Sequence, residues 1–308
     1  QCLIALEEIE LNHYRPSRPN EGWENVFGGQ VLAQATWAAS RTIDEDRICH
    51  SLHGYFLRPG NKGVPILYKV DRIRDGKSFT TRRVVAIQKG QAIFNMSISF
   101  QVYEEGLEHQ FTAPNSPTPG ALIKEESSTF AQGSLDQLET MDNPHLPISI
   151  DVLNIEEGQT EVREKMPCQK SWMRCRHTLP DEAIYHQCAM VYLSDWSLLD
   201  TSFIHRDLDY SNGDYQIASL DHAMWFHHPI CATDWHLFDQ ESPNSSGARG
   251  YNRGLVYDES GKLVASTMQE GLINNQSSGL AACARQIISL AGLAADSQYN
   301  SRGKRTFQ

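Results

Sequence analysis

An internal repeat is the feature of this sequence that most constrains its fold. Tyr55–Pro59 reads Y-F-L-R-P, and Trp225–Pro229, 170 positions later, reads W-F-H-H-P. Two further matches lie downstream at offsets of 170 and 171: Arg83–Ile87 with Arg253–Tyr257, and Gly90–Phe94 with Gly261–Ala265. Matching segments at a nearly fixed offset indicate a structural unit that occurs twice in tandem.

Each copy of the repeat predicts one helix followed by four strands. In the first copy, the alanine-rich segment Gly29–Thr42 carries apolar residues at helical spacing. Ala92–Tyr103 alternates apolar with polar residues, which is typical of a strand with one buried face. The strands expected in this copy are His50–Leu57, Pro65–Arg74, Phe79–Gln88 and Ala92–Tyr103.

The second copy predicts the same order of elements. Pro180-Asp-Glu is a helix start, and the apolar segment Glu182–Leu199 is long enough for a central helix. Ahead of this helix we expect strands around Val152–Asn154 and Gln169–Cys175. The four strands of the copy are predicted at Ile217–His227, Trp235–Glu241, Gly250–Asp258 and Leu263–Ile273.

The chain is therefore expected to adopt an α+β fold in two similar halves that form one pseudo-symmetric body. We predict a first half at residues 1–115, a crossover at 116–150, a second half at 151–276 and an extension at 277–308. The crossover is rich in Pro, Ser, Thr and Glu, with a short helix predicted near Ser128–Met141. In the extension, an amphipathic helix is predicted at Leu280–Asp296.

The composition is that of a soluble globular protein. The 308 residues are 40% hydrophobic and 21% charged, and no run approaches the roughly 18 apolar residues that span a bilayer. The N-terminal stretch lacks the basic region of a signal peptide, which favours an intracellular protein. Because the seven cysteines have no zinc-ligand spacing, no metal is expected.

The charge distribution excludes one class of partner and leaves another open. A formal net charge of −11 argues against nucleic-acid binding. Residues 47–89 are locally basic, with ten Lys or Arg against Asp71 and Asp75. This stretch is either a solvated strand face, which general considerations favour, or a patch that binds an anionic ligand.

Three polar residues stand where the repeat predicts a buried surface. Gln269 falls on an apolar position of the first copy and needs hydrogen-bond partners, because an unpaired buried amide costs about 1–3 kcal/mol. Asp195 lies on the apolar stripe of the second helix, and Ser219 shares a strand face with Asp221. An acid, a hydroxyl and an amide from three elements can hold a water molecule. The alternatives are a structural polar network, or Asp195 as the cap of a nearby loop.

Other site motifs are absent from the sequence. It contains no G-x-S-x-G elbow, no H-E-x-x-H, no G-x-G-x-x-G and no P-loop. His50 and His53 on one strand point to opposite faces, as do the adjacent His227 and His228, so neither pair suits a metal.

Gly28, Gly29 and Gln30 stand at the start of the first predicted helix. The glycines permit another backbone or a ligand to approach closely, and the free N–H groups of a helix start favour negative charge. Close packing of the helix on the sheet is compatible with both properties.

Several motifs of this sequence resemble those of the type II acyl-CoA thioesterases, from about residue 5 to residue 275. They are Val26–Gln30 (VFGGQ), His50–Gly60 (HSLHGYFLRPG), Asp75–Phe79 (DGKSF), Leu220–His227 (LDHAMWFH), Ala248–Gly250 (ARG) and Val264–Gly271 (VASTMQEG). The resemblance implies a double hotdog fold, in which each half wraps an antiparallel sheet around one long helix. It also implies hydrolysis of fatty acyl-CoA to a free fatty acid and CoA, without a cofactor.

The resemblance assigns the family's catalytic Asp, Ser/Thr and Gln to Asp195, Ser219 and Gln269. Asp195 would then act as general base on a water molecule that Ser219 and Gln269 orient. Backbone N–H groups around Gly28–Gln30 would polarise the thioester carbonyl, and basic residues such as Arg58 would meet the CoA phosphates.

Two alternatives remain open. One is another hotdog-fold acyl-CoA enzyme, such as an enoyl-CoA hydratase, which would need an Asp/His pair. Asp221-His222 is the nearest candidate pair in the sequence. Because adjacent strand residues face opposite ways, we interpret this pair as a structural signature. The other is a non-catalytic acyl-CoA-binding module. Fold analogy predicts a homodimer or higher homo-oligomer. The expected compartment is the peroxisome or the cytoplasm, although no Ser-Lys-Leu-type C-terminus is visible.

Overall fold

The computed structural model describes residues 3–17, 25–123, 138–141, 148–155, 166–204 and 215–275. The helix predicted at Leu280–Asp296 and the whole segment 277–308 lie outside these residues. Within the described ranges, no helix is both long and apolar enough to cross a membrane.

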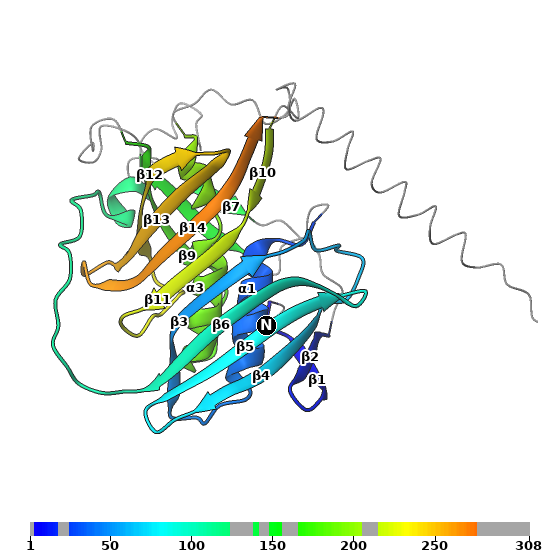
Figure 1. Cartoon of the computed structure of the whole chain (residues 1–308). Coiled ribbons are helices and arrows are strands. Elements are labelled where there is room, and N and C mark those ends of the chain that lie inside the picture. The colour runs from blue at the N-terminus through cyan, green and yellow to red at the C-terminus, as the bar shows by residue number, and fades with distance from the viewer. Residues whose placement is uncertain are drawn as a thin grey trace, which may run out of the picture.

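One continuous antiparallel sheet contains all the described strands (Figure 1). The first half contributes β1 (Leu6–Glu10), β2 (His13–Pro16), β3 (Arg47–Phe56), β4 (Leu67–Asp75), β5 (Phe79–Gln88) and β6 (Gln91–Val102). The second half contributes β7 (Leu138–Met141), β8 (Ile150–Ile155), β9 (Cys168–Cys175), β10 (Tyr215–Ser219), β11 (Asp221–Phe226), β12 (His236–Ser246), β13 (Arg249–Asp258) and β14 (Leu263–Asn275). The order is β1-β2-β4-β5-β6-β3-β11-β14-β13-β12-β9-β8-β7, with β10 also paired to β14.

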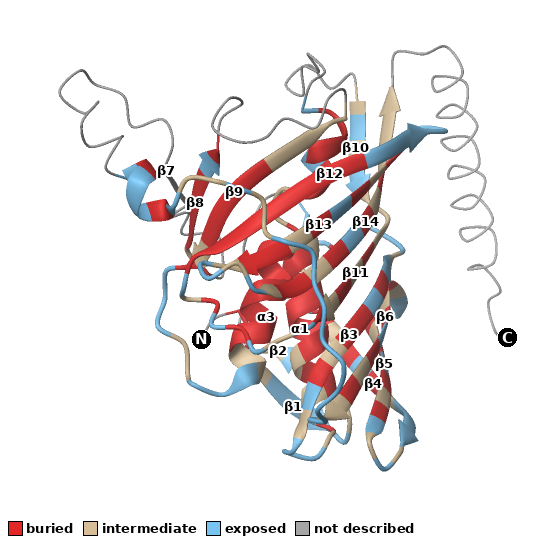
Figure 2. Ribbon diagram, turned by 90° about the vertical axis from the view of Figure 1, so that its left-hand side faces the viewer, coloured by how far each residue is buried: buried red, intermediate tan, exposed pale blue. Residues whose placement is uncertain are grey.

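Two helices, α1 (Gly28–Ser40) and α3 (Ala183–Ser194), lie side by side on one face of this sheet (Figures 1 and 2). Both are buried along most of their length, as Figure 2 shows. Their backbones meet closely at Gly29, where an added Cβ would lie 2.7 Å from the carbonyl oxygen of Tyr192. The glycine at the start of α1 therefore serves helix packing, as its small size predicts.

The pairing of the strands confirms the repeat. At the centre of the sheet β3 pairs with β11, and His53 lies opposite Ala223, its own equivalent 170 positions later. Register shifts occur at Ala86/Ile87 in the first half and at Val256/Tyr257 in the second, again 170 apart. The expected arrangement of one helix wrapped by a sheet in each half is confirmed.

The strand predicted at Ile217–His227 is broken at Leu220. The prediction that Ser219 and Asp221 share one face of this strand is therefore wrong. The Leu220 N–H donates to the Glu270 carbonyl and the Leu220 carbonyl accepts from Phe56 N, both at 2.9 Å. The break reverses the alternation of side chains. Asp221 turns its carboxylate to the backbone N–H of Glu270, 2.7 Å away, whereas His222 is fully buried. Ser219 and Asp221 accordingly do not face the same partners.

Two helix predictions also need correction. The helix predicted at Glu182–Leu199 ends at Ser194, and a short 3₁₀ helix, η2 (Leu199–Ser202), follows. Asp195 thus caps the end of α3 instead of lying within its apolar stripe. The last residues of the helix predicted near Ser128–Met141 form β7, because they pair with β8; residues 124–137 are outside the described part. Strands β1 and β2 were not predicted.

Candidate active site

The carboxylate of Asp195 lies where the C-terminal end of α3 meets the N-terminal end of α1. Asp195 is 7% exposed and accepts hydrogen bonds from the backbone N–H of Gly29 and from Nε2 of Gln269, the latter at 2.5 Å. The first N–H groups of a helix have no intrahelical acceptor and carry a partial positive charge. The start of α1 therefore favours an anionic carboxylate at this position.

The pKa of Asp195 is raised to about 7, chiefly because burial penalises the charged carboxylate. The hydrogen bonds from Gln269 and from the Gly29 N–H act in the opposite direction, and the negative charge of Asp200 adds slightly to the increase. A carboxyl group that titrates near neutral pH is suited to general base catalysis, because it is ionised at pH 7–8 and still binds a proton well.

Gln269 and Ser219 come together beside this carboxylate from two paired strands. Ser219 ends β10, opposite Gly271 of β14, and Gln269 lies two residues before that glycine. Gln269 is 1% exposed, and its Nε2 lies 3.1 Å from Ser219 Oγ as well as 2.5 Å from Asp195 Oδ1. The prediction that Gln269 points inward and is hydrogen-bonded is therefore confirmed in the geometry.

The predicted glycines border the same carboxylate. A Cβ added to Gly28 would lie 2.7 Å from Asp195 Oδ2 and 2.9 Å from the ring of Phe56. Phe27, one residue earlier, packs edge-to-face on Tyr192 and on Trp196, with ring centroids 5.0 and 5.9 Å apart. The backbone of Gly28, which has no side chain, thus leaves the space that the Asp195 carboxylate and the ring of Phe56 occupy.

Two other predicted residues are placed differently. Gln30 is buried in the first turn of α1, and its N–H already donates to the carbonyl of Phe27 at 3.1 Å. Arg58 is exposed after β3, and its guanidinium donates to the carbonyl of Ala92 at 2.6 Å. The structure therefore brings Gly28 and Gly29, but not Arg58, to the Asp195 carboxylate.

His222 is a residue of this site that the sequence reasoning missed. Its ring is fully buried, with Nε2 2.9 Å from Ser194 Oγ and Nδ1 3.7 Å from Asp195 Oδ1. Burial lowers its pKa to about 3, so the ring is neutral. A regular strand would have placed His222 on the face opposite Ser219, and only the break at Leu220 brings both residues inward.

The first half lacks a counterpart of Gln269 at the matching position. Where the second half has Gln269 paired with Asn252, the first half has Ile98 paired with Arg82. Arg82 is 1% exposed and donates to the side chain and the carbonyl of Thr42 at 2.8 and 2.9 Å. A structural guanidinium therefore occupies the equivalent region of the first half.

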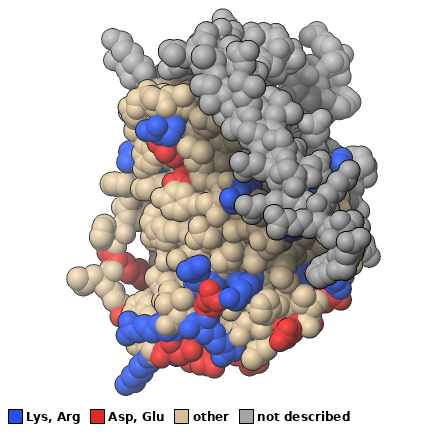
Figure 3. Space-filling model, turned by 45° about the vertical axis from the view of Figure 1, so that its right-hand side comes forward, with Lys and Arg blue, Asp and Glu red and all other residues tan. Residues whose placement is uncertain are grey.

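Part of the basic stretch is charge-compensated along its strands. Asp71 lies 3.4 Å from Lys69 and 3.9 Å from Arg83, and Asp75 lies 2.5 Å from Arg82. Figure 3 shows Lys and Arg intermixed with Asp and Glu on the lower part of the visible face. The ion pairs of Asp71 favour the interpretation of a solvated strand face, whereas Arg82 is buried.

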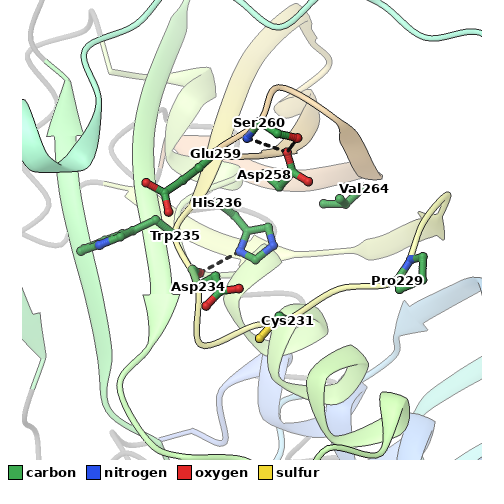
Figure 4. A pocket seen from close by; sticks show the side chains of 9 residues that line it. All are labelled: Pro229, Cys231, Asp234, Trp235, His236, Asp258, Glu259, Ser260 and Val264. Carbon is green, nitrogen blue, oxygen red and sulfur yellow. Dashed lines mark hydrogen bonds between the residues drawn. The ribbon is translucent and has the colours of Figure 1, made fainter.

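A surface pocket of about 260 Å³ lies apart from these residues (Figure 4). It is lined by Pro229, Cys231, Asp234, Trp235, His236, Asp258, Glu259, Ser260 and Val264. None of the residues around Asp195 lines it. Over the described part of the chain, no group of His, Cys, Asp or Glu side chains is arranged to hold a metal ion.

Comparison with known proteins identifies relatives in both halves. A family described as acyl-CoA thioesterase matches residues 154–272, and one described as the acyl-CoA thioesterase N-terminal domain matches residues 16–101. Acyl-CoA thioesterase 2 of Haemophilus influenzae is 35% identical over 278 residues, which are 88% of this chain and 95% of that protein. Acyl-coenzyme A thioesterase 8 of Mus musculus is 37% identical over 290 residues, covering 88% of this chain and 87% of that protein.

The fold is that of solved relatives. The crystal structure of an acyl-CoA thioesterase II from Mycobacterium marinum has a TM-score of 0.75 and 36% identity, covering 90% of this chain and 97% of that one. A protein with a hot dog fold from Alicyclobacillus acidocaldarius, 16% identical, has a TM-score of 0.70 over 89% of this chain and 97% of that one. The expected double hotdog fold is thereby confirmed.

Proposed function

The chain belongs to the acyl-CoA thioesterase family, and from this premise we propose that Asp195, Ser219 and Gln269 activate the water molecule that hydrolyses its thioester substrate. The protein is an enzyme that hydrolyses acyl-CoA thioesters.

One observation carries the assignment: a single amide nitrogen, Nε2 of Gln269, bonds both Asp195 Oδ1 and Ser219 Oγ. An ionised carboxylate is an acceptor only, so the amide must present its N–H to it. The acid, the hydroxyl and the amide therefore converge within hydrogen-bond distance. A water molecule bound beside them could donate one proton to the carboxylate while its oxygen accepts from the Ser219 hydroxyl, which Gln269 orients by donating to Ser219 Oγ.

In the proposed reaction, Asp195 takes one proton from water as the water oxygen forms a bond to the thioester carbonyl carbon. The resulting tetrahedral oxyanion collapses, the C–S bond breaks, and the fatty acid leaves with the oxygen of water. The proton held by Asp195 passes to the CoA thiolate, so that free thiol is released. No covalent acyl-enzyme forms, because the nucleophile is water.

The test is the release of free thiol from palmitoyl-CoA by Asp195→Asn, which keeps the size of the side chain and removes its basicity. We expect kcat to fall at least 100-fold, the usual contribution of a general base. The matched control is Asp181→Asn, which changes an exposed carboxyl group ahead of α3 and should stay close to wild type. Turnover by Asp195→Asn at the wild-type rate would overturn the assignment.

The alternative hotdog chemistry, hydration of an enoyl-CoA, would use Asp221-His222. The carboxylate of Asp221 accepts from the backbone N–H of Glu270 on β14, whereas the adjacent His222 is fully buried, so the two side chains do not form an Asp/His pair. An absorbance change with enoyl-CoA substrates, in the absence of thiol release, would favour this alternative over hydrolysis.

We further propose that the substrate is a fatty acyl-CoA and that Arg58 and other basic residues of 47–89 contact its phosphates. We also propose that the protein is a homodimer or higher homo-oligomer, and that it is located in the peroxisome or the cytoplasm. The excess of Lys and Arg in residues 47–89 supports the proposed contact with the CoA phosphates. Arg58→Ala should raise KM for palmitoyl-CoA without changing kcat. Light scattering would measure the oligomeric state, and cell fractionation the compartment.

A further inference from the structure

The imidazole of His222 is fully buried and lies between the end of α3 and the Asp195 carboxylate. Its Nε2 is 2.9 Å from Ser194 Oγ, and Ser194 Oγ donates to the carbonyl of Val191 at 2.9 Å. A hydroxyl has one proton to give, and here the carbonyl takes it. The hydrogen atom between Ser194 and His222 therefore belongs to the ring, which assigns the Nε2–H tautomer.

In this neutral tautomer, Nδ1 carries a lone pair and can only accept a hydrogen bond. Nδ1 is buried and has no hydrogen-bond partner among the described residues, and Asp195 Oδ1 stands 3.7 Å from it. Two acceptors repel one another, which explains the gap at this distance while the carboxylate is ionised. A protonated carboxyl group, by contrast, is a donor for Nδ1.

We infer that His222 accepts a hydrogen bond from the protonated carboxyl group of Asp195 during turnover. It is thus a positioning residue that holds the proton taken from water until the leaving thiolate receives it. The water proton moves to Asp195 as the C–O bond forms, the Asp195 O–H points to His222 Nδ1, and the proton passes to sulfur after the C–S bond breaks. His222 itself neither gains nor loses a proton. This role rests on Asp195 being the general base, as proposed above.

Several groups face the Asp195 carboxyl group and bear on its titration. They are Tyr192 of α3, Asp200 of η2, His222 of β11, Gln269 of β14 and the Gly29 N–H of α1. Gln269 and the Gly29 N–H stabilise the ionised form. Tyr192 Oη and Gln269 Oε1 also lack a hydrogen-bond partner among the described residues, but Nδ1 of His222 already lies 3.7 Å from Asp195 Oδ1, a distance that a small rotation of the side chain closes.

The test compares two amide substitutions that differ in which ring nitrogen they replace. In His222→Asn the short amide lies near the place of Nδ1 and can accept from Asp195. In His222→Gln the longer amide reaches toward Ser194 and leaves no acceptor beside Asp195. We expect His222→Gln to lower kcat roughly tenfold, as for one lost hydrogen bond in a buried site, and to move the acid limb of the pH profile about one unit lower. His222→Asn should retain the wild-type midpoint and most of kcat.

Equal effects of the two variants on kcat and on the midpoint, or a midpoint that moves up in His222→Gln, would overturn the inference. If either variant unfolds, the tautomer decides: ¹⁵N spectra of the wild type at pH 8 should show His222 protonated at Nε2, and protonation at Nδ1 would contradict us. The proposed function fails separately, through an active Asp195→Asn. An inactive Asp195→Asn with indistinguishable His222 variants refutes the present inference alone.

Discussion

Gly28 of α1 lies against the carboxylate of Asp195 so closely that a Cβ on this residue would come within 2.7 Å of Oδ2. Only a residue without a side chain fits there. The position of the acid is thus set from two sides, by the end of its own helix α3 and by the start of α1.

Gly28→Ala should therefore displace the Asp195 carboxylate or Phe56. We expect kcat to fall by roughly 100-fold, the effect of misplacing a catalytic group by about 1 Å. Gly120→Ala is the control, because an added Cβ there meets nothing within 4 Å. Wild-type kcat in Gly28→Ala, measured by thiol release, would show that the carboxylate position is not critical.

The rate of hydrolysis should depend on pH through Asp195. The general base must be ionised and its pKa is about 7, so kcat/KM should fall about tenfold per pH unit below pH 7 and level off above it. In Gln269→Ala, the loss of a hydrogen bond that stabilises the carboxylate should move the midpoint upward. A midpoint near the ordinary aspartate pKa of about 4 would contradict this prediction.

The same group should affect stability in the opposite direction to an ordinary salt-bridged acid. Because burial raises its pKa from 3.8 to about 7, folding favours the protonated form of Asp195. Its contribution to stability is thus fully present below pH 4 and is lost as pH rises to 7. Asp195→Asn should be more stable than wild type at pH 8, by on the order of 3 kcal/mol, and the difference should shrink toward pH 4. Denaturant unfolding at both pH values measures it.

Ser219 contributes a hydroxyl, and the rest of its side chain is predicted to be dispensable. Ser219→Ala removes the partner of Gln269 Nε2 and should lower kcat about tenfold. Ser219→Thr keeps the hydroxyl and should retain most of the activity. If Thr were as damaging as Ala, the size of the side chain rather than its oxygen would be the important property.

Arg82 is predicted to be structural, although it lies in the basic stretch. Its buried guanidinium donates to Thr42 and Arg74 and contacts Asp75. Arg82→Ala leaves these groups without their donor and should cost about 3 kcal/mol or more in unfolding free energy. Arg83→Ala, at a half-exposed neighbour, should cost less than about 0.5 kcal/mol. Loss of activity without loss of stability in Arg82→Ala would instead indicate a substrate contact.

The repeat made most of this fold predictable. Positions 170 apart share turns and bulges, so each half predicted the other, and the polar residue Gln269 stood out against the Ile98 of the first half. The repeat could not predict the end of α3, because Asp195, Trp196 and the leucines that follow continue a helical pattern. At the residue after its end, the carboxylate of Asp195 accepts from the Gly29 N–H at the start of α1, a tertiary contact that local sequence does not carry.

The sequence predicted Asp195, Ser219 and Gln269 but not His222, because the position of His222 also depends on tertiary structure. A strand with regular alternation puts Ser219 and His222 on opposite faces, and His222 was therefore set aside. The break at Leu220, which exchanges hydrogen bonds with Glu270 and Phe56, is a property of the assembled sheet. Had the sequence contained a glycine or proline at that position, the break would have been readable.

The pairing of His53 with Ala223 joins the halves along what would be the two-fold axis of a symmetric dimer. In a dimer of identical chains, any substitution appears in both subunits, and both sites must change together. Placing both units on one polypeptide removes that constraint. In this chain one unit carries Arg82 and Ile98 at the positions where the other carries Asn252 and Gln269. The covalent link thus permits the two halves to differ. The first half supplies α1, whose start contacts Asp195, and the second half supplies the acid, the hydroxyl and the amide.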